Sequence, residues 1–314
     1  MTNCPMCGSG NKKSILKTKD RDPRGLKLDK TFHLVKCLDC SLCFIENMPK
    51  KEELARYYGR EYYAQKNFSN KLMNKIAMLS RVSKIKAKKG SILDYGCGNG
   101  DFLLKMKQEG WNVNGVEFSE AGRKMAENKL GIKINDEKWF NKLNKKFDVI
   151  TLWHVLEHIE MPNETLKKLR KILNKNGLLA MSVPNIDAFQ SNIFKKNTFH
   201  LDIPRHSVHY SPKSISRLLN TNRFKVIGFN HYSLEYNPFG LIQSFLNSIG
   251  CEFNFLYNLI KRGYKRRVGP LKFFYSFFAT FILLPFLIPI AVPITYIESF
   301  LGHGASFVVY AKKR

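Results

Sequence analysis

The pattern of apolar and polar positions separates a short N-terminal region from a long region in which strands alternate with helices. Short apolar runs bounded by glycine, asparagine and lysine predict strands at 91–95, 112–117, 132–134, 147–153, 177–183, 224–231 and 305–311. Apolar residues recur at helical spacing between these runs. Strands that alternate with helices predict an α/β fold, in which a parallel sheet is covered on both faces.

The region before the first of these strands has a different pattern. Short strands are expected near 14–17 and 32–35, and helices over 49–63 and roughly 68–87, the second of them basic and amphipathic. The expected domains are a small module at 1–48, a helical linker or substrate cap at 49–90, the main domain at 91–238 and 303–314, and an insertion at 239–302.

Composition limits the class of protein. The chain has 314 residues, of which 44% are hydrophobic, so it can bury the core of one large domain with an appendage. Its formal net charge of +27 fits binding to nucleic acid, binding to an anionic membrane, or a solvated lysine-rich exterior. Much of the lysine is scattered in pairs along helical stretches, which favours the solvated exterior for most of it.

Four cysteines near the N-terminus form two C-x-x-C pairs, Cys4 with Cys7 and Cys37 with Cys40. The sequence shows no signal-peptide pattern, so we expect a reducing, cytoplasmic setting in which paired cysteines bind metal. Two such pairs around short strands predict a zinc ribbon with one structural Zn²⁺. Cys43 and His33 are alternative ligands.

A glycine-rich loop follows the first strand of the main domain. Residues 94–100 read Asp-Tyr-Gly-Cys-Gly-Asn-Gly and precede a predicted helix, whose unpaired N–H groups can bind a ligand. Glu117 ends the next strand, where an acid can accept hydrogen bonds from ribose hydroxyls. The dinucleotide fingerprint G-x-G-x-x-G does not fit, because Asp101 occupies its third glycine position.

The loop resembles the first motif of class I S-adenosylmethionine-dependent methyltransferases, D-x-G-x-G-x-G. Together with 147–158, 177–185 and 204–212, it is similar to the branch that includes ubiquinone-pathway O-methyltransferases and sugar or polysaccharide methyltransferases, several with an N-terminal zinc ribbon. The resemblance covers roughly 90–232 and the last strand. It implies a seven-stranded, Rossmann-like sheet with an antiparallel last strand.

The resemblance also implies roles for individual residues toward S-adenosylmethionine. The methionine end of the cofactor would be held by Asp94, Gly96, Gly98 and Gly100. Glu117 would bind the ribose, with Phe118 beside the adenine and Asp136 at the adenine amine. Trp153 is a further candidate for contact with the cofactor.

Histidines supply the candidate catalytic groups, which are His154, His206 and His209. Methyl transfer to a hydroxyl often needs a base, and the ordinary pKa of histidine suits that role. His154, Glu157 and His158 also have the H-x-x-E-H spacing of a zinc protease. They could bind a divalent ion, or Glu157 and His158 could only cap and orient the local helix. Their position at the end of a sheet strand argues against a protease.

The insertion contains a long apolar segment. Residues 273–297 carry no charged side chain, and as a helix they would be about 38 Å long. Pro285, Pro289 and Pro293 interrupt helical hydrogen bonds, and a single crossing would place the last strand on the far side of the membrane. We therefore expect a bent re-entrant or interfacial segment, helped by basic residues at 261–272. The alternative is a buried lid or a dimer interface.

These features predict an enzyme that methylates a lipid, a lipid-linked sugar or a quinone-like acceptor at the inner face of the cell membrane. The anionic membrane surface would be its partner, and the enzyme would be bound to that surface as a peripheral or monotopic protein. One alternative is an rRNA or tRNA methyltransferase that binds RNA through the ribbon and a basic surface. Another is a non-catalytic scaffold that binds the cofactor.

Overall fold

The computed structural model describes residues 3–21, 30–50, 52–54, 56–57, 78–262, 266 and 268–314, with only the backbone of 261 and 262. The chain forms two compact units. The sheet unit comprises Ile76–Val183, Pro212–Asn230 and Val308–Arg314. The ribbon–helix unit comprises Met1–Lys75, Pro184–Ser211 and His231–Phe307.

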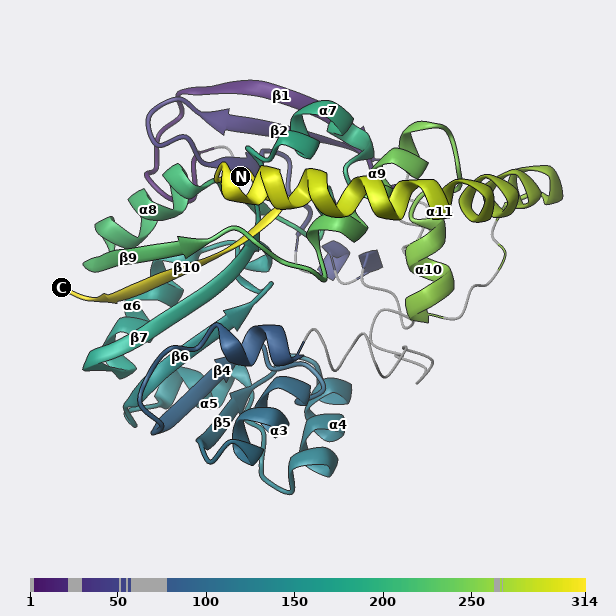
Figure 1. Cartoon of the computed structure of the whole chain (residues 1–314). Coiled ribbons are helices and arrows are strands. Elements are labelled where there is room, and N and C mark those ends of the chain that lie inside the picture. Colours follow the sequence, from purple (N-terminus) through teal and green to yellow (C-terminus); the bar gives the residue numbers. More distant parts are fainter. Residues whose placement is uncertain are drawn as a thin grey trace. The chain divides into compact units, whose positions relative to one another are not determined.

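The sheet unit is built on a six-stranded sheet of order β5-β4-β6-β7-β10-β9 (Figure 1). Its strands are β4 (Ser91–Tyr95), β5 (Asn112–Val116), β6 (Phe147–Trp153), β7 (Leu173–Pro184), β9 (Phe224–Asn230) and β10 (Ser306–Lys313). β4 runs parallel to β5 and β6, β6 runs parallel to β7, and β10 is antiparallel to β9. The expected antiparallel last strand is confirmed.

Helices follow the strands as the sequence pattern predicts. They are α3 (Asp101–Gln108), α4 (Glu120–Leu130), α5 (Glu137–Lys142), α6 (Pro162–Ile172) and α8 (Pro212–Thr221). The core between sheet and helices includes Ile92, Leu103, Val149 and Ala180, all fully buried. This apolar packing fixes the carboxyl ends of β4, β5 and β6, where the glycine loop lies.

The expected seventh strand at 132–134 is wrong for the part of the chain that the structure describes. Only a single parallel bridge forms there, between Val116 and Asn135. The backbone N–H of Ile134 donates to Glu127 Oε1 (2.9 Å) rather than to a strand, although the Ile134 side chain is buried in the core. Asn135 exchanges both of its backbone hydrogen bonds with β5 and the residue that follows it, and no ladder extends from this bridge in the described part of the chain.

The ribbon–helix unit contains a second, antiparallel sheet of order β1-β2-β3-β8. Its strands are β1 (Lys12–Lys19), β2 (Thr31–Cys37), β3 (Cys43–Ile45) and β8 (Val208–His209). The two predicted ribbon strands are confirmed. β8 comes from a distant segment and pairs with β3, so the loop at 199–211 is part of the ribbon sheet.

Helices make up the rest of this unit. They are α7 (Phe189–Phe194), α9 (Asn237–Ser248), α10 (Phe255–Arg262) and α11 (Pro270–Phe300), with short turns η2 (Lys195–Asn197) and η3 (Phe199–Leu201). In the predicted linker, 52–54 and 56–57 are helical, and a helix at 78–83 ends earlier than expected. The rest of the two predicted linker helices up to residue 77 lies outside the described residues.

The expected bend in the apolar segment is wrong, because α11 is one helix of 31 residues that continues through Pro285, Pro289 and Pro293. Prolines four residues apart lie on one face of a helix, and all three are exposed. Each proline lacks the N–H that would donate within the helix, so the missing hydrogen bonds all lie on the exposed side of α11. The inner side of α11 keeps its backbone bonds and packs against α9.

Candidate functional site

The glycine loop connects β4 to α3 through three residues in the left-handed region. Gly96, Gly98 and Gly100 have φ values of 81°, 56° and 79°, which explains why glycine is needed at each position. An added Cβ at Gly96 would lie 2.5 Å from Val155 Cγ2, whereas one at Gly98 would meet no atom within 4 Å. The backbone at Gly98 therefore faces open space, as a ligand-binding loop requires.

Glu117 reaches this loop from the end of β5. Its carboxylate accepts hydrogen bonds from the backbone N–H of Gly98 and of Ser119, each at 2.8 Å. A carboxylate has about four acceptor positions, so two remain for the hydroxyls of a ribose. The structure brings together the predicted ribose acid and the predicted loop.

Asp94 lies buried at the end of β4. Thr151 Oγ1 on β6 donates to Asp94 Oδ1 at 2.6 Å, and burial raises the pKa of Asp94 to about 7. Near neutral pH this carboxyl can therefore change its charge, and a cationic ligand nearby would favour the ionised form. Sequence reasoning missed Thr151, although a polar residue inside an apolar strand was a signal.

Aromatic rings border the ends of β4 and β6. Phe118 is 43% exposed, and its ring centroid lies 5.2 Å from that of Tyr95, edge to face. Trp153 is buried at the end of β6 and packs edge to face on Phe102. The exposed face of Phe118 is free to stack on a planar base, whereas Trp153 mainly fills the core.

Asp136 has a local role in the structure. It is the N-cap of α5, where its carboxylate accepts the Trp139 N–H at 2.9 Å. This hydrogen bond lowers the pKa of Asp136. The predicted contact with the adenine amine stays a prediction.

His154 follows β6 in a left-handed conformation, with φ 55°. Its Nε2 lies 3.1 Å from Ser182 Oγ, and its Nδ1 lies 3.3 Å from Glu157 Oε1. Only Leu156–His158 form a 3-10 turn, so the H-x-x-E-H stretch lacks the α-helical face that a zinc protease motif uses. A carboxylate on one ring nitrogen fixes the tautomer and orientation of the imidazole.

His206 and His209 lie in the ribbon–helix unit. His206 Nδ1 is 3.0 Å from the carbonyl oxygen of His200, and its ring is 6.1 Å from that of His209. His209 is buried in β8 opposite Cys43. Their predicted catalytic role stays a prediction.

The four predicted zinc ligands converge at the base of the ribbon. Cys4 Sγ lies 3.4 Å from Cys40 Sγ, Cys7 Sγ lies 3.6 Å from Cys37 Sγ, and all four sulfurs lie within 4.8 Å of one another. A tetrahedral ZnS₄ site has sulfurs about 3.8 Å apart, so the four thiols fit zinc. The Cys40 thiol donates to Cys4, which lowers the pKa of Cys4 to about 5.

The alternative ligands are placed less well. Burial raises the pKa of Cys43 to about 12, and Cys43 is not among the four clustered cysteines of the described residues. His33 Nδ1 lies 3.7 Å from Glu46 Oε2. The geometry favours the four predicted cysteines over both alternatives.

A parallel sheet with a glycine loop after its first strand and an acid after its second defines the class of α/β proteins that bind a nucleotide-like cofactor. Residues 63–228 match the family model described as "Methyltransferase domain", which is more than half of the chain. The chain belongs to this family and is an S-adenosylmethionine-dependent methyltransferase of class I.

Curated relatives include the mitochondrial ubiquinone biosynthesis O-methyltransferase of Saccharomyces cerevisiae, which is 30% identical over 158 residues, 46% of this chain and 49% of the relative. The ubiquinone biosynthesis O-methyltransferase of Coxiella burnetii is 27% identical over 146 residues, 43% of this chain and 62% of the relative. The chain thus spans about half to three-fifths of the length of these relatives.

Solved structures with a similar fold include two methyltransferases. One is a SAM-dependent methyltransferase from Archaeoglobus fulgidus, with a TM-score of 0.46, 21% identity, and coverage of 78% of this chain and 95% of that chain. The other is a possible histamine N-methyltransferase from Thermotoga maritima, with a TM-score of 0.45, 20% identity, and coverage of 77% and 92%.

Proposed function

We propose that this protein transfers a methyl group from S-adenosylmethionine to an oxygen of a lipophilic acceptor at a membrane surface. The acceptor class is a lipid, a lipid-linked sugar or a quinone-like molecule. The observation that carries the proposal is α11, a long helix with an exposed apolar face in a chain that also has the methyltransferase loop. The names of the curated relatives, which act in ubiquinone biosynthesis, support an O-methylated lipophilic acceptor.

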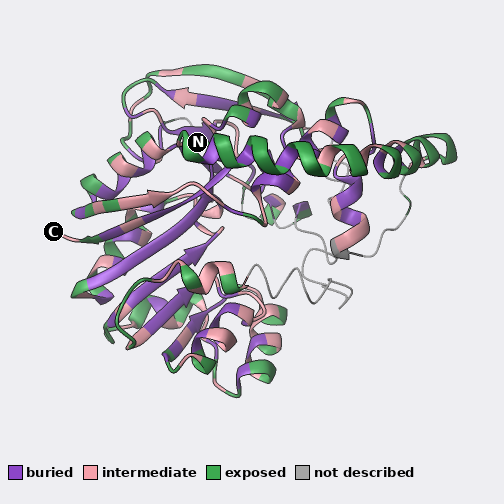
Figure 2. Cartoon of the chain, viewed as in Figure 1, coloured by how far each residue is buried: buried purple, intermediate pink, exposed green. Residues whose placement is uncertain are grey.

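The amphipathic pattern of α11 is opposite to that of a helix in a soluble protein. Its buried positions are small or polar: Ser276, Thr280, Ala291, Thr295, Glu298 and Ser299. Large apolar residues are exposed, among them Phe278, Ile282 and Phe286. Much of α11 has the colour of exposed residues in Figure 2. Such a surface is costly in water and favourable in a bilayer, so it supports membrane contact.

The ends of α11 are both bound to the ribbon–helix unit. Near its start, Ser276 Oγ accepts the Glu252 N–H (2.8 Å), and Tyr275 OH donates to the Ile249 carbonyl (2.7 Å). Near its end, Asn237 Nδ2 donates to Ser299 Oγ (2.9 Å). By length and composition α11 could cross a membrane. If α11 crossed the bilayer, its two ends would lie on opposite sides and could not both keep these contacts with one unit. We therefore propose that α11 lies in the membrane interface.

The basic cluster at 261–272 was expected to assist membrane binding. The side chains of 261 and 262 and the whole of 265 and 267 lie outside the described residues. Lys272 Nζ donates to the carbonyl of Gly250, which places one cation at the start of α11. A cation there can face anionic headgroups while the apolar side chains enter the bilayer.

For the chemical step, we propose His154 as the base. His154 directly precedes Val155, which packs against Gly96, so His154 lies close to the glycine loop. The Glu157 carboxylate can stabilise the imidazolium that forms when His154 takes a proton. The acceptor hydroxyl attacks the methyl carbon of the sulfonium, the carbon–sulfur bond breaks, and the hydroxyl proton passes to His154. S-adenosylmethionine supplies the electrophilic methyl group. Asp94, Glu117 and the loop orient it for in-line attack.

The experiment uses the full-length protein in detergent, S-adenosylmethionine labelled in its methyl group, and total membrane lipid from the source cells. We expect label in a lipid product that is one methylene unit heavier by mass spectrometry. His154→Gln should retain cofactor binding and slow transfer by about 10²-fold or more. Label confined to the aqueous phase, or equal rates in His154→Gln and wild type, would contradict the proposal.

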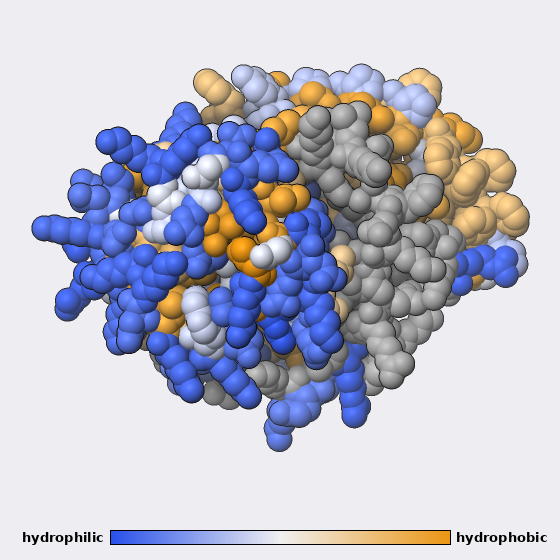
Figure 3. Space-filling model, turned by 90° about the horizontal axis from the view of Figure 1, so that it is seen from below, coloured by the Kyte–Doolittle hydropathy of each residue, from blue (hydrophilic) through white to orange (hydrophobic). Residues whose placement is uncertain are grey.

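The alternative of an RNA substrate has one supporting observation. Hydrophilic side chains gather over the left part of the face shown in Figure 3, and the net charge of the chain is +27. A parallel reaction with total RNA tests this alternative. Label in RNA and none in lipid would replace the lipid acceptor with RNA.

A further inference from the structure

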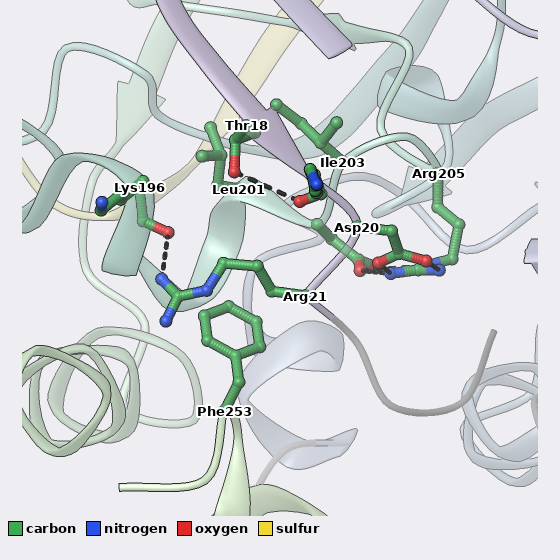
Figure 4. Close-up of a pocket in the computed structure, with 10 residues that line it drawn as sticks. Thr18, Asp20, Arg21, Lys196, Leu201, Ile203, Arg205 and Phe253 are labelled. Carbon is green, nitrogen blue, oxygen red and sulfur yellow. Dashed lines mark hydrogen bonds and ion pairs between the residues drawn. The ribbon is translucent and has the colours of Figure 1, made fainter. Parts of the chain in front are cut away.

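A shallow hollow that is partly open to solvent lies in the ribbon–helix unit at the end of β1 (Figure 4). Its lining comes from three segments that are far apart in the sequence: 18–21, 196–205 and the turn between α9 and α10 that carries Phe253. None of these residues belongs to the cofactor loop or the cysteine cluster. The hollow therefore calls for an explanation of its own.

Arg205 forms one wall and is fully engaged. Its Nε and Nη2 donate to Asp202 Oδ1 (2.9 and 2.7 Å), its Nη1 and Nη2 donate to the Asp20 carboxylate (3.1 and 3.0 Å), and its Nη1 also donates to the Tyr57 carbonyl (3.0 Å). All five N–H groups of this guanidinium are used. Arg205 thus holds both acids of the hollow and has no donor left for a ligand.

Arg21 lies opposite and is bound differently. Its guanidinium stacks 4.5 Å above the Phe253 ring, and its Nη1 donates to the Lys196 carbonyl (3.1 Å) and to Asn197 Oδ1. These acceptors are neutral. Among the residues that the structure describes, no carboxylate pairs with Arg21, and its Nε and Nη2 donate to none.

This arrangement leaves a partly desolvated cation without an anion from the described residues. Burial lowers the pKa of Arg21, although an arginine remains charged. Lys196 adds a further positive charge to the lining, whereas Asp20 and Asp202 are held by Arg205. The open side of the hollow is therefore positive.

We propose that this hollow, which we call the Arg21 hollow, binds a phosphate group. The Nε–H and Nη2–H groups lie on one edge of the guanidinium, and that edge matches two phosphate oxygens. Phe253 belongs to the same turn as Glu252, whose N–H donates to Ser276 of α11. The phosphate would therefore sit beside the membrane-facing helices, as the polar end of an amphipathic molecule does.

Two sources supply such a phosphate: the headgroup of a bilayer lipid, or a phosphate on the methyl acceptor itself. The second source rests on the proposed methyl transfer, and the first rests only on the proposed contact with a membrane. Phosphatidic acid in phosphatidylcholine vesicles represents the first source. Geranyl phosphate, a small soluble prenyl phosphate, represents the second, with geraniol and inorganic phosphate as comparisons.

The variant is Arg21→Gln, which removes the charge and keeps an amide donor for the neutral acceptors. Lys195→Gln is the matched control, because Lys195 is exposed on neighbouring η2 and does not line the hollow. Arg21→Lys keeps the charge without the two-pronged edge and serves if Arg21→Gln fails to fold. Cofactor binding measured by calorimetry should be the same in all three variants and wild type.

We expect Arg21→Gln to weaken binding to at least one probe by about tenfold or more, and Lys195→Gln by less than about twofold. An effect on phosphatidic acid vesicles, but not on phosphatidylserine vesicles of matched surface potential, assigns the headgroup. An effect on geranyl phosphate assigns the acceptor. Equal binding of Arg21→Gln and wild type to both probes overturns the proposal, as does an equal loss in Lys195→Gln.

A failure of this proposal differs from a failure of the proposed function. If calorimetry detects no S-adenosylmethionine binding while the Arg21 effect persists, the methyl-transfer proposal fails and the phosphate site stands. If cofactor binding and lipid methylation persist without an Arg21 effect, only the phosphate site fails.

Discussion

Glu117 has two functions in the site at the scale of single residues. Its carboxylate fixes Gly98 by accepting that residue's N–H, and it retains acceptor positions for a ligand. Asp94 is a different kind of acid, since it is buried beside Thr151 and its pKa is raised to about 7. One carboxylate therefore shapes the loop, while the other can respond to pH and to a bound cation.

Replacement of the ribose acid should weaken cofactor binding. We expect Glu117→Ala to bind S-adenosylmethionine at least about tenfold more weakly, because two ribose hydroxyls lose their acceptor at a cost of about 1–3 kcal/mol. Calorimetry measures the change. The control is Glu120→Ala, an exposed acid in the first turn of α4. Unchanged affinity in Glu117→Ala would remove Glu117 from the cofactor site.

The pKa of Asp94 predicts a pH dependence of stability. The folded protein holds the Asp94 proton up to about pH 7, whereas the unfolded chain releases it near the ordinary value of 3.8. The folded state binds more protons between these values, so the contribution of Asp94 to stability falls as pH rises from about 4 to 7. Asp94→Asn keeps the acceptor for Thr151 Oγ1 and removes the titration.

Thermal unfolding of the cofactor-free protein measures this effect. We expect the Tm of Asp94→Asn to rise relative to wild type as pH increases from about 5 to 8, and the difference to level off above the folded pKa. Glu109, whose ion pair with Lys105 lowers its pKa, should show no such trend in this pH range when it is replaced by glutamine. A difference between Asp94→Asn and wild type that does not vary with pH would contradict the raised pKa.

At the scale of elements, the strands of the ribbon meet at a cluster of four thiols as well as at an apolar core that includes Phe32, Leu34 and Ile45. Four sulfurs within 4.8 Å of one another hold the base of a sheet whose third strand has only three residues. Repulsion between thiolates in such a cluster is relieved by a divalent cation, so we expect metal binding and ribbon folding to be coupled.

One zinc ion per chain should be found in protein purified without chelator. The double variant Cys4→Ser/Cys37→Ser should lose the metal, because each C-x-x-C pair loses one thiolate. Cys43→Ser should retain it, since Cys43 is a buried thiol outside the four-cysteine cluster. Elemental analysis checks both. Less than half an equivalent in wild type, or full metal content in the double variant, would count against the site.

At the scale of the whole molecule, α11 has an apolar surface that the residues described by the structure leave exposed. Phe278, Ile282 and Phe286 are 57%, 62% and 65% exposed and recur every four residues. They therefore line one face of the helix. The opposite, polar stripe is bound to the turn after α9 near its start and to α9 near its end, so the helix can offer this face to a bilayer without leaving the fold.

Membrane retention should survive high salt. At about 0.5 M salt the Debye length falls to roughly 4 Å, which removes headgroup attraction and leaves the apolar contribution. Wild-type protein should stay in the membrane pellet and be released by detergent. Phe278→Ser/Ile282→Ser/Phe286→Ser should shift it to the supernatant, since three lost apolar contacts cost at least about 3 kcal/mol, a more than hundredfold loss of partitioning.

The control triple Ile15→Ser/Leu79→Ser/Ile227→Ser replaces exposed apolar residues elsewhere and should leave the protein in the pellet. Both triples should bind S-adenosylmethionine as wild type does. Wild-type protein that is soluble and monomeric without detergent would refute the interfacial role of α11 and favour a lid.

The sequence by itself determined the features that depend on local chemistry. The turn at 94–100 needs glycine because its φ values are positive, and the two C-x-x-C pairs bring thiols together over a few residues. Glu117 was found because it directly follows an apolar strand. Periodicity also located the six strands of the main sheet, because each buried strand is a compact apolar run.

Only the tertiary structure decided the features that join distant segments. β8 pairs with the ribbon, Thr151 meets Asp94, and the segment at 132–135 forms a single bridge to β5 in place of the expected strand. The helix α11 continues through three prolines because its bonded side packs on α9. These outcomes depend on which donor reaches which acceptor across the fold, and no local pattern of apolar and polar residues records that choice.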